Sequence, residues 1–333
     1  MNRLRKLVAA AALIGFASAA PAAVDGLVIF GDSLSDTGNV AAAAGIDAGQ
    51  VITGNTYIPS LPYASGQFTN RDVWAKTFAG AIGLGSFGQP SLLGGWNFAF
   101  GGARTATDGE TPSLLAQEAM FLTRTSGIAS PTALYVIAGG GNDARDALQA
   151  AAANPANAVS IIGTAALAYA QNIGTLVDQL QTAGGIDIVV WNVPNLGLAP
   201  AVTAQGQMAS GLGSQVASFM NAALAARLSI ESNVLLFDVF GLQSSFAGNA
   251  AALGLANVTD ACGAVPGCDP STYVYWDGIH PTSAGHALLA QAMLEQTAFI
   301  TAVPEPEAYA LMLAGLGVVA LYGRRRRQPA SAG

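Results

Sequence analysis

The chain has 333 residues, of which 52% are hydrophobic and only 10% are charged, and its net charge at neutral pH is −7. This length is enough for one large domain or two small ones. Basic residues gather at the two ends, so positions 24–302 hold 6 basic and 18 acidic side chains, a net charge of −12. This balance argues against a nucleic-acid partner, which calls for a basic patch.

The first 23 residues have the features of a secretory signal peptide. Three basic residues within the first six are followed by the apolar stretch Leu7–Phe16 and by small residues that allow cleavage between Ala17 and Ala23. This order of features is typical of export signals, so we expect cleavage by signal peptidase and a mature domain that starts near residue 24. A buried first helix is the alternative.

The central part of the chain alternates between strand-like and helix-like stretches. Five short apolar runs are predicted strands: Val24–Phe30, Trp96–Phe100, Ala133–Ala138, Ile186–Val193 and Val234–Val239. The clearest predicted helices are Pro155–Gln181, Ser210–Ile230 and Ser283–Phe299. Apolar strands separated by helices indicate an α/β fold with a mainly parallel sheet covered on both faces. Ala41–Asn70, rich in Gly, Ala, Tyr and Pro, is predicted to be a long loop, either lining a substrate cleft or lying irregularly on the surface.

Polar and glycine residues follow three of these predicted strands directly. Ser33 follows the first strand, Gly101 and Gly102 follow the second, and Asn142 follows the third. Functional loops of a parallel sheet leave the carboxyl ends of its strands, so these residues are expected at one edge of the sheet. The alternative roles are an N-cap for Ser33, a positive-φ turn for the glycines and an Asx-turn or helix cap for Asn142.

A second polar motif, Asp277-Gly278-Ile279-His280, lies far downstream. A serine, a histidine and an aspartate are the minimum for an activated oxygen nucleophile, because the histidine takes the proton and the carboxylate orients the imidazole. His280 is preferred over His286, the other histidine, because His286 falls inside a predicted helix. Asp277 is preferred as the orienting carboxylate because it alone has the short spacing to His280. The rival carboxylates are Asp36 and Asp143.

Two further groups of side chains lie near these motifs. Cys262 and Cys268, the only cysteines, bracket a turn-rich segment, and in an exported protein such a pair favours a small disulfide loop over free thiols or a zinc site. Six aromatic residues flank the motifs, and for any one of them packing is expected more than substrate contact; they are Tyr57, Tyr63, Trp96, Tyr273, Tyr275 and Trp276.

Residues 303–327 form a second targeting element. Pro304-Glu305-Pro306 precedes the apolar stretch Ala308–Gly323, and four arginines follow it. This order resembles the PEP-CTERM sorting signal of Gram-negative bacteria. The resemblance implies recognition by an exosortase-type membrane protease and export to the cell envelope, the cell surface or the medium, with the apolar helix at least transiently in the membrane. A permanent single-span anchor is the alternative.

Four segments match, in order, the sequence blocks of a known enzyme family. They are Phe30–Asp36, Asn97–Ala103, Gly140–Asp143 and Asp277–Thr282. Over residues 24–300 the chain therefore resembles the GDSL-type SGNH hydrolases. The resemblance implies a three-layer α/β/α sandwich with a flavodoxin-like sheet, and Ser33, Asp277 and His280 as the catalytic residues. It also implies an oxyanion hole formed by the N–H groups of Ser33 and Gly102, with Gly101 as the second choice, and by the amide of Asn142.

The expected reaction is hydrolysis of a carboxylic ester through a serine acyl-enzyme, without a metal or an organic cofactor. The substrate is expected to be an ester of a small molecule, a lipid or a carbohydrate. These three classes stay open because the fold and the catalytic residues do not choose among them. Two alternatives stay open. One is a catalytically inert surface or matrix protein on the same scaffold, and the other is an acyltransferase that passes the acyl group to an alcohol.

Overall fold

The computed structural model describes residues 24–45, 63 and 66–301. Val24–Thr297 form one compact unit, and the two ends of the chain form another, of which only residues 298–301 are described. The predicted signal peptide and the predicted sorting segment therefore lie outside the described residues. Among the residues that are described, no helix has the length and apolar character that crossing a membrane requires.

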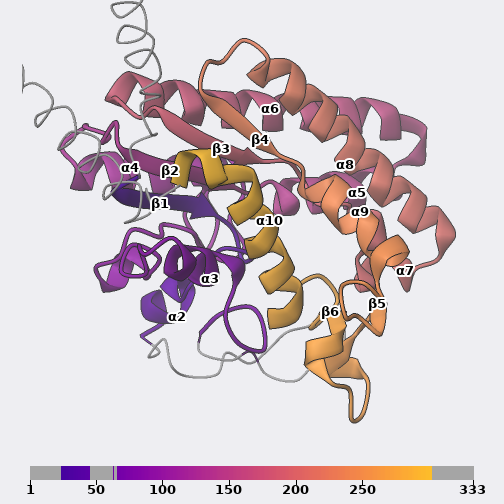
Figure 1. Cartoon of the computed structure of the whole chain (residues 1–333). Coiled ribbons are helices and arrows are strands. Elements are labelled where there is room, and N and C mark those ends of the chain that lie inside the picture. The colour runs from indigo at the N-terminus through magenta and orange to yellow at the C-terminus, as the bar shows by residue number, and fades with distance from the viewer. Residues whose placement is uncertain (1–23, 46–62, 64–65, 302–333) are drawn as a thin grey trace, which may run out of the picture. The chain divides into compact units, whose positions relative to one another are not determined.

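The core of the compact unit is a four-stranded parallel sheet (Figure 1). Its strands lie in the order β1 (Gly26–Gly31), β2 (Ala133–Ala138), β3 (Asp187–Trp191) and β4 (Val234–Phe237). Every neighbouring pair is parallel. Each strand falls within one of the predicted apolar runs or starts and ends close to it, so these four predictions are confirmed. β4 ends before the predicted Val239 because Asp238 caps the next helix, its side chain accepting the Gly241 N–H at 2.8 Å.

The predicted strand Trp96–Phe100 is the one that does not form as a regular strand. This segment runs along the outer edge of β1 and makes only isolated parallel bridges, which join Asn97 to Ile29 and to Pro90. The Asn97 side chain explains the irregularity, because its Oδ1 accepts the Ala99 N–H at 2.9 Å and its Nδ2 donates to the Ser35 carbonyl at 2.7 Å. The bond to Ala99 is a local side-chain bond, and such bonds compete with a regular ladder.

Helices cover both faces of the sheet, and the alternation of side chains along each strand explains how. Ile188 and Val190 of β3 join the large apolar cluster shared with the first helix layer. That layer comprises α4 (Leu114–Arg124), α5 (Gly141–Ala153), α6 (Ala158–Ala183) and α8 (Gln207–Leu228). Trp191 faces the other way, toward Trp74 at a ring distance of 4.4 Å and toward Met293, whose Sδ accepts its N–H at 3.1 Å.

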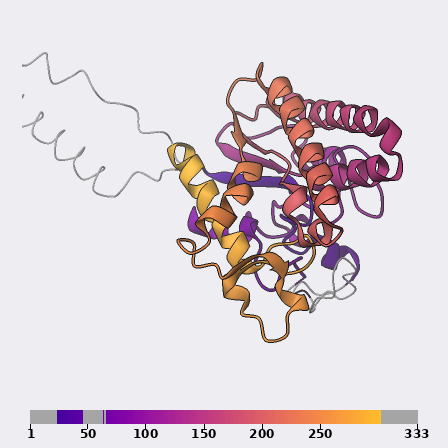
Figure 2. The same cartoon turned by 90° about the vertical axis from the view of Figure 1, so that its right-hand side faces the viewer.

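The second helix layer is therefore built from the elements that carry Trp74 and Met293. These are α3 (Trp74–Ala81) and α10 (Ser283–Thr301). Figure 2 separates α10 clearly from the long helices α6 and α8. With a sheet between two helix layers, the unit is the three-layer α/β sandwich that the sequence predicts.

Smaller elements complete the unit. The remaining helices are α2 (Asn39–Ala43), α7 (Pro200–Thr203) and α9 (Val239–Asn249), with short 3₁₀ turns at Ser91–Leu93, Pro155–Asn157, Leu196–Leu198, Cys262–Ala264 and Pro270–Thr272. Two further strands, β5 (Asn257–Ala261) and β6 (Tyr273–Tyr275), pair in parallel as a separate sheet. β6 leads directly into the segment that holds Asp277 and His280.

Candidate active site

Ser33 lies in a tight turn that leaves the carboxyl end of β1. The turn is built on Asp32, whose backbone carbonyl accepts the N–H groups of Ser35 and Asp36, both at 3.0 Å. The Asp32 carboxylate also accepts the Leu34 N–H at 3.0 Å. These bonds curl the chain around Ser33 and turn its side chain away from the sheet, toward the loop after β6.

The side chain of Gln117, which sequence reasoning did not single out, fixes the strand end just before this turn. Its Oε1 accepts the Gly31 N–H and its Nε2 donates to the Gly31 carbonyl, both at 2.9 Å. Gln117 belongs to α4 and is fully buried. A side-chain amide at this point satisfies both backbone groups of Gly31 where the sheet ladder stops.

Ser33, His280 and Asp277 form a continuous chain of hydrogen bonds. The distance from Ser33 Oγ to His280 Nε2 is 2.8 Å, and the distance from His280 Nδ1 to Asp277 Oδ2 is 2.7 Å. The other carboxylate oxygen, Asp277 Oδ1, accepts the N–H groups of Ile279 and His280, both at 2.7 Å. The three predicted catalytic residues thus meet, although Ser33 and His280 are 247 positions apart in the sequence.

The surroundings of Asp277 keep its carboxyl group ionised. Burial would raise its pKa, but the charge of His280 and hydrogen bonds from His280 and Tyr63 outweigh burial and lower the pKa to about 2. A permanent carboxylate at this position fixes the imidazole with its Nδ1–H toward Asp277, which leaves Nε2 as an acceptor facing Ser33.

The rival histidine is buried away from Ser33, and the rival carboxylates have other partners. His286 is fully buried in α10, neither of its ring nitrogens has a partner among the described residues, and burial lowers its pKa to about 3. Asp36 accepts N–H groups of its own loop and of Gly101. Asp143 is bonded to the backbone and hydroxyl of Thr105.

Two of the three predicted oxyanion donors, Ser33 and Asn142, line the same cavity. The Gly101 N–H donates to Asp36 Oδ2 at 2.9 Å, so the second choice for the glycine donor is already engaged. Gly102 has a φ of 80°, and neither its N–H nor that of Ser33 has an acceptor among the described residues. The Asn142 amide donates one N–H to the Ala103 carbonyl at 2.9 Å, which fixes the side chain and leaves its second N–H available.

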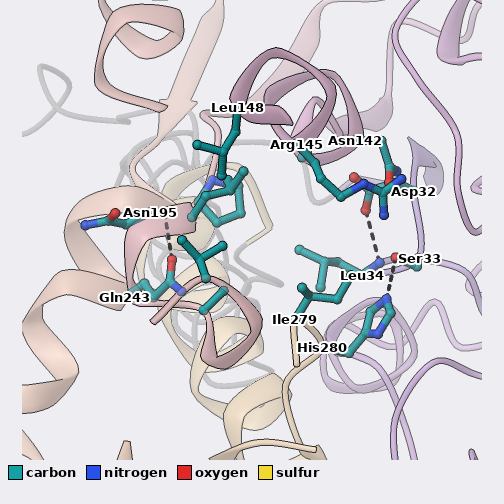
Figure 3. A pocket seen from close by; sticks show the side chains of 15 residues that line it. Asp32, Ser33, Leu34, Asn142, Arg145, Leu148, Asn195, Gln243, Ile279 and His280 are labelled. Carbon is teal, nitrogen blue, oxygen red and sulfur yellow. Dashed lines mark hydrogen bonds between the residues drawn. The ribbon is translucent and has the colours of Figure 1, made fainter. Parts of the chain in front are cut away.

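A cavity of about 100 Å³ opens beside Ser33 (Figure 3). Ser33, His280 and Asn142 lie at one end of it, and Asn195 and Gln243 lie at the other. Its walls are mostly apolar and include Leu34, Leu148, Leu196, Ala199, Val202 and Ile279. None of the six aromatic residues considered above is among its described lining residues, and Tyr57 lies outside the described part of the chain.

Two charged residues also line this cavity, Asp32 and Arg145. Asp32 is buried, and burial raises the pKa of its carboxyl group to about 6, although the Leu34 N–H and the charges of His280 and Arg145 act in the opposite direction.

Two aromatic rings from the predicted loop Ala41–Asn70 enclose His280. The Tyr63 ring meets the imidazole edge-on at 5.7 Å, and the Phe68 ring lies at 5.5 Å with an interplanar angle of 31°. The Tyr63 hydroxyl also donates to Asp277 Oδ2 at 2.5 Å. The sequence suggested only packing for Tyr63, and no spacing in it pointed to this contact.

Cys262 and Cys268 form a disulfide with a Cα–Cα distance of 5.6 Å. The bridge closes the loop between β5 and β6, and Cys262 packs in a small buried cluster with Tyr63 and Trp276. The described residues contain no group of three or more His, Cys, Asp or Glu side chains that could hold a metal ion.

Known proteins resemble this chain in sequence over nearly its whole length. Esterase EstA from Pseudomonas aeruginosa is 30% identical over 350 aligned residues, which cover 91% of this chain and 52% of that protein. Esterase EstA from Pseudomonas putida gives the same values. The chain thus spans about half the length of the curated relatives it matches.

Among solved structures, phospholipase A1 from Streptomyces albidoflavus NA297 aligns with 82% of this chain and 100% of its own, at 17% identity and a TM-score of 0.42. This likeness is too distant to bear on function.

Two family profiles match the sequence itself. The profile of the PEP-CTERM protein-sorting motif matches residues 302–327. The profile of the GDSL-like lipase/acylhydrolase family matches residues 27–293, which include the turn of Ser33, both glycines, Asn142 and the loop of Asp277 and His280. Because that match covers most of the chain, the protein belongs to the GDSL-like lipase/acylhydrolase family.

Proposed function

We propose that this protein is an exported serine esterase that hydrolyses carboxylic esters through an acyl-enzyme. One arrangement supports this proposal most directly: the 2.8 Å contact from Ser33 Oγ to His280 Nε2, continued by the 2.7 Å contact from His280 Nδ1 to Asp277 Oδ2. Membership of the GDSL-like lipase/acylhydrolase family and the esterase names of the Pseudomonas relatives agree with it.

In the first half of the reaction, Ser33 Oγ attacks the carbonyl carbon of the ester while its proton passes to His280 Nε2. Asp277, already ionised, stabilises the imidazolium that forms. The tetrahedral intermediate then collapses, the bond to the alcohol oxygen breaks, and His280 returns its proton to that oxygen. The acyl group is left on Ser33 as an ester.

In the second half, water replaces the alcohol. His280 takes a proton from the water, the hydroxide oxygen attacks the acyl carbon, and the proton then returns to Ser33 Oγ as the carboxylic acid leaves. In both halves the negative carbonyl oxygen is assigned to the N–H groups of Ser33 and Gly102 and to the free N–H of Asn142. Losing one such donor costs about 2.7–4 kcal/mol of barrier in related chemistry.

Replacing Ser33 by alanine tests the proposal. We expect Ser33→Ala to lower kcat for p-nitrophenyl acyl esters by more than about a thousandfold, because no other nucleophile is assigned to the reaction. Activity within tenfold of the unaltered protein would remove Ser33 from the mechanism.

Labelling and product analysis separate the alternatives. A fluorophosphonate probe should label the unaltered protein at Ser33 and leave Ser33→Ala unlabelled, whereas an inert scaffold would not react at all. With glycerol added, an acyltransferase would release glycerol esters in place of free acid. A panel of esters with increasing acyl length then tests whether the acyl chain binds along the apolar wall of the cavity. Each CH₂ that is buried there contributes about 0.8 kcal/mol to binding.

The sorting segment supports a proposal about where the protein resides in the cell. The PEP-CTERM match at residues 302–327 indicates export and sorting to the envelope of a bacterium. We propose that a signal peptidase removes residues 1–23, that an exosortase-type protease recognises the Pro304–Pro306 box, and that the apolar stretch holds the protein in the membrane at least until then. Fractionating cells that produce the full chain, with and without residues 303–333, tests whether this segment decides where the enzyme resides.

A further inference from the structure

We propose that Tyr63 is a positioning residue that holds Asp277 and His280 in their reactive arrangement and sets the lower end of the pH range in which the enzyme works. This inference rests on the proposed function, because it concerns the same pair of side chains. It gives a role to a residue outside the four sequence blocks, in the segment predicted as a loop.

The contact that carries the proposal is a shared carboxylate oxygen. Asp277 Oδ2 accepts the Tyr63 hydroxyl at 2.5 Å and the His280 Nδ1–H at 2.7 Å, and the Tyr63 oxygen lies 3.2 Å from Nδ1. Tyr63, Asp277 and His280 are all buried. Hydrogen bonds to a charged acceptor in a buried place are among the stronger ones in proteins.

The Tyr63 ring is held in place by the disulfide loop. Tyr63, Cys262 and Trp276 form one buried cluster, and Phe68 packs on its edge, at 5.3 Å from the Tyr63 ring. The Gly263 N–H donates to the Trp276 carbonyl at 2.9 Å, which ties the disulfide loop to the residue just before Asp277. The cluster therefore fixes Tyr63 relative to the acid with which it bonds.

Residues 66–70 are also tied to the chain that follows His280. Thr69 Oγ1 donates to the Pro281 carbonyl at 2.9 Å. Asn70 Nδ2 donates to Ser283 Oγ at 3.3 Å, and Asn70 Oδ1 accepts the Ser283 N–H at 2.7 Å. These three bonds join the segment that carries Phe68 to the chain just after His280.

The electrostatic consequence has a definite sign. A hydroxyl donor stabilises the carboxylate and withdraws part of its charge from the imidazolium. Removing that donor strengthens the attraction between Asp277 and protonated His280, so His280 stays protonated, and unable to accept the Ser33 proton, up to a higher pH. It also leaves the carboxylate one contact fewer to hold it in place.

Other titratable groups lie near His280, and their effects on its protonation must be distinguished from the effect of Tyr63. Asp32 lies on the turn after β1, and His286 lies on α10; the charge of His280 acts on both. Asp143 and Arg145, on α5, act in turn on Asp32. Asp32 also lines the cavity beside Ser33, and burial raises the pKa of its carboxyl group to about 6, so the test includes a variant of it.

The first experiment compares Tyr63→Phe with the unaltered full chain. We expect kcat to fall roughly tenfold with KM within about twofold, because Tyr63 does not line the cavity, and the acid limb of kcat/KM to move up by roughly half a pH unit. Tyr135→Phe is the matched control: it removes another buried hydroxyl, which donates to the Ser130 carbonyl at 3.0 Å, near the opposite end of the strands. It should leave the acid limb where it is.

The second experiment needs no activity. The chain has two histidines, so an NMR titration of the imidazole C–H signals follows each one, with His280 assigned by its loss in His280→Asn. Tyr63→Phe should move the His280 titration upward, and it should do so again in an Asp32→Asn background, where Asn can still accept the Leu34 N–H. An unchanged or downward titration, or a shift that vanishes without Asp32, would overturn the proposal, even if kcat falls.

Failure of this inference and failure of the proposed function give different results. If the unaltered chain hydrolyses no ester, or if Ser33→Ala retains its activity, the function is wrong whatever Tyr63 does. If the unaltered chain is active and Ser33-dependent while Tyr63→Phe leaves both pH titrations unchanged, only the role of Tyr63 is wrong.

Discussion

At the scale of single residues, the packing around residue 101 requires glycine, which has no side chain. A Cβ added to Gly101 would lie 2.3 Å from two ring atoms of Phe68. The same ring lies 5.5 Å from the imidazole ring of His280, and the Gly101 N–H donates to Asp36 Oδ2. Gly101 thus lets an aromatic ring pass between the imidazole and the turn that presents the Gly102 N–H.

Gly101→Ala should therefore damage both packing and catalysis. The added methyl group must displace Phe68, and overpacking of this kind costs about 1–3 kcal/mol of stability. We expect a lower free energy of unfolding in urea and a kcat reduced roughly tenfold, since the imidazole loses one of its walls.

Gly109→Ala serves as the control for that substitution. A Cβ there meets no atom within 4 Å, so neither stability nor kcat should change appreciably. A Gly101→Ala protein with unaltered kcat and stability would mean that Phe68 can move without consequence for His280.

At the scale of secondary-structure elements, α4 carries two neighbouring buried polar residues, one with hydrogen-bond partners and one without any among the described residues. Gln117 has partners for its amide at Gly31, at the end of β1. Glu118 is fully buried as well, yet neither of its carboxylate oxygens has a partner among the described residues. Burial raises the pKa of Glu118 to about 8, so the folded protein keeps this carboxyl group protonated at neutral pH.

Glu118→Gln should make the protein more stable at alkaline pH. Below pH 4.5 the proton is bound in both the folded and the unfolded state, so Glu118 adds no pH dependence there. Between about pH 4.5 and 8 only the unfolded chain ionises Glu118, so the free energy of unfolding falls by about 1.4 kcal/mol per pH unit. The glutamine variant removes this slope.

Urea unfolding at pH 5 and at pH 8 measures the effect, with Glu110→Gln as the control at an exposed position. The stability gain of Glu118→Gln should be larger at pH 8 than at pH 5. Equal gains at the two pH values would show that Glu118 finds a partner or reaches water in the folded state.

The elements also show which parts of the fold the sequence could predict. Long apolar runs predicted all four strands of the main sheet, because burial on both faces leaves a continuous apolar signal. Trp96–Phe100 carries the same signal, yet Asn97 diverts the ladder, and that depends on Ser35, which is distant in sequence. β5 and β6 were missed because short, partly exposed strands have no strong period.

At the scale of the whole molecule, the strand-end rule of parallel sheets applied to Ser33, the two glycines and Asn142 only. Asp277 and His280 follow β6, which belongs to the separate small sheet, so their meeting with Ser33 was predicted from the chemistry of a serine nucleophile and from the family resemblance. Tyr63 followed no such rule, because its partner Asp277 lies 214 positions away in the sequence. Its neighbours Thr69 and Asn70 show the same limit, since their partners lie more than 200 positions away.

The compact unit Val24–Thr297 should work without the chain ends. We expect a protein of residues 24–301 to match the full-length chain in kcat/KM for p-nitrophenyl esters and in thermal midpoint, because every described contact of Ser33, Asn142 and His280 lies inside that unit. Circular dichroism confirms folding before the rates are compared. A folded but inactive 24–301 protein would place part of the site in the terminal segments.

The distance along the chain between Ser33 and His280 has a consequence for biosynthesis. A ribosome makes the nucleophile near the start and its base close to the end, so a growing polypeptide carries only an ordinary, unreactive alcohol. A chain that ends before residue 277 lacks both Asp277 and His280. The proposed chemistry is thereby confined to molecules whose translation has passed residue 280.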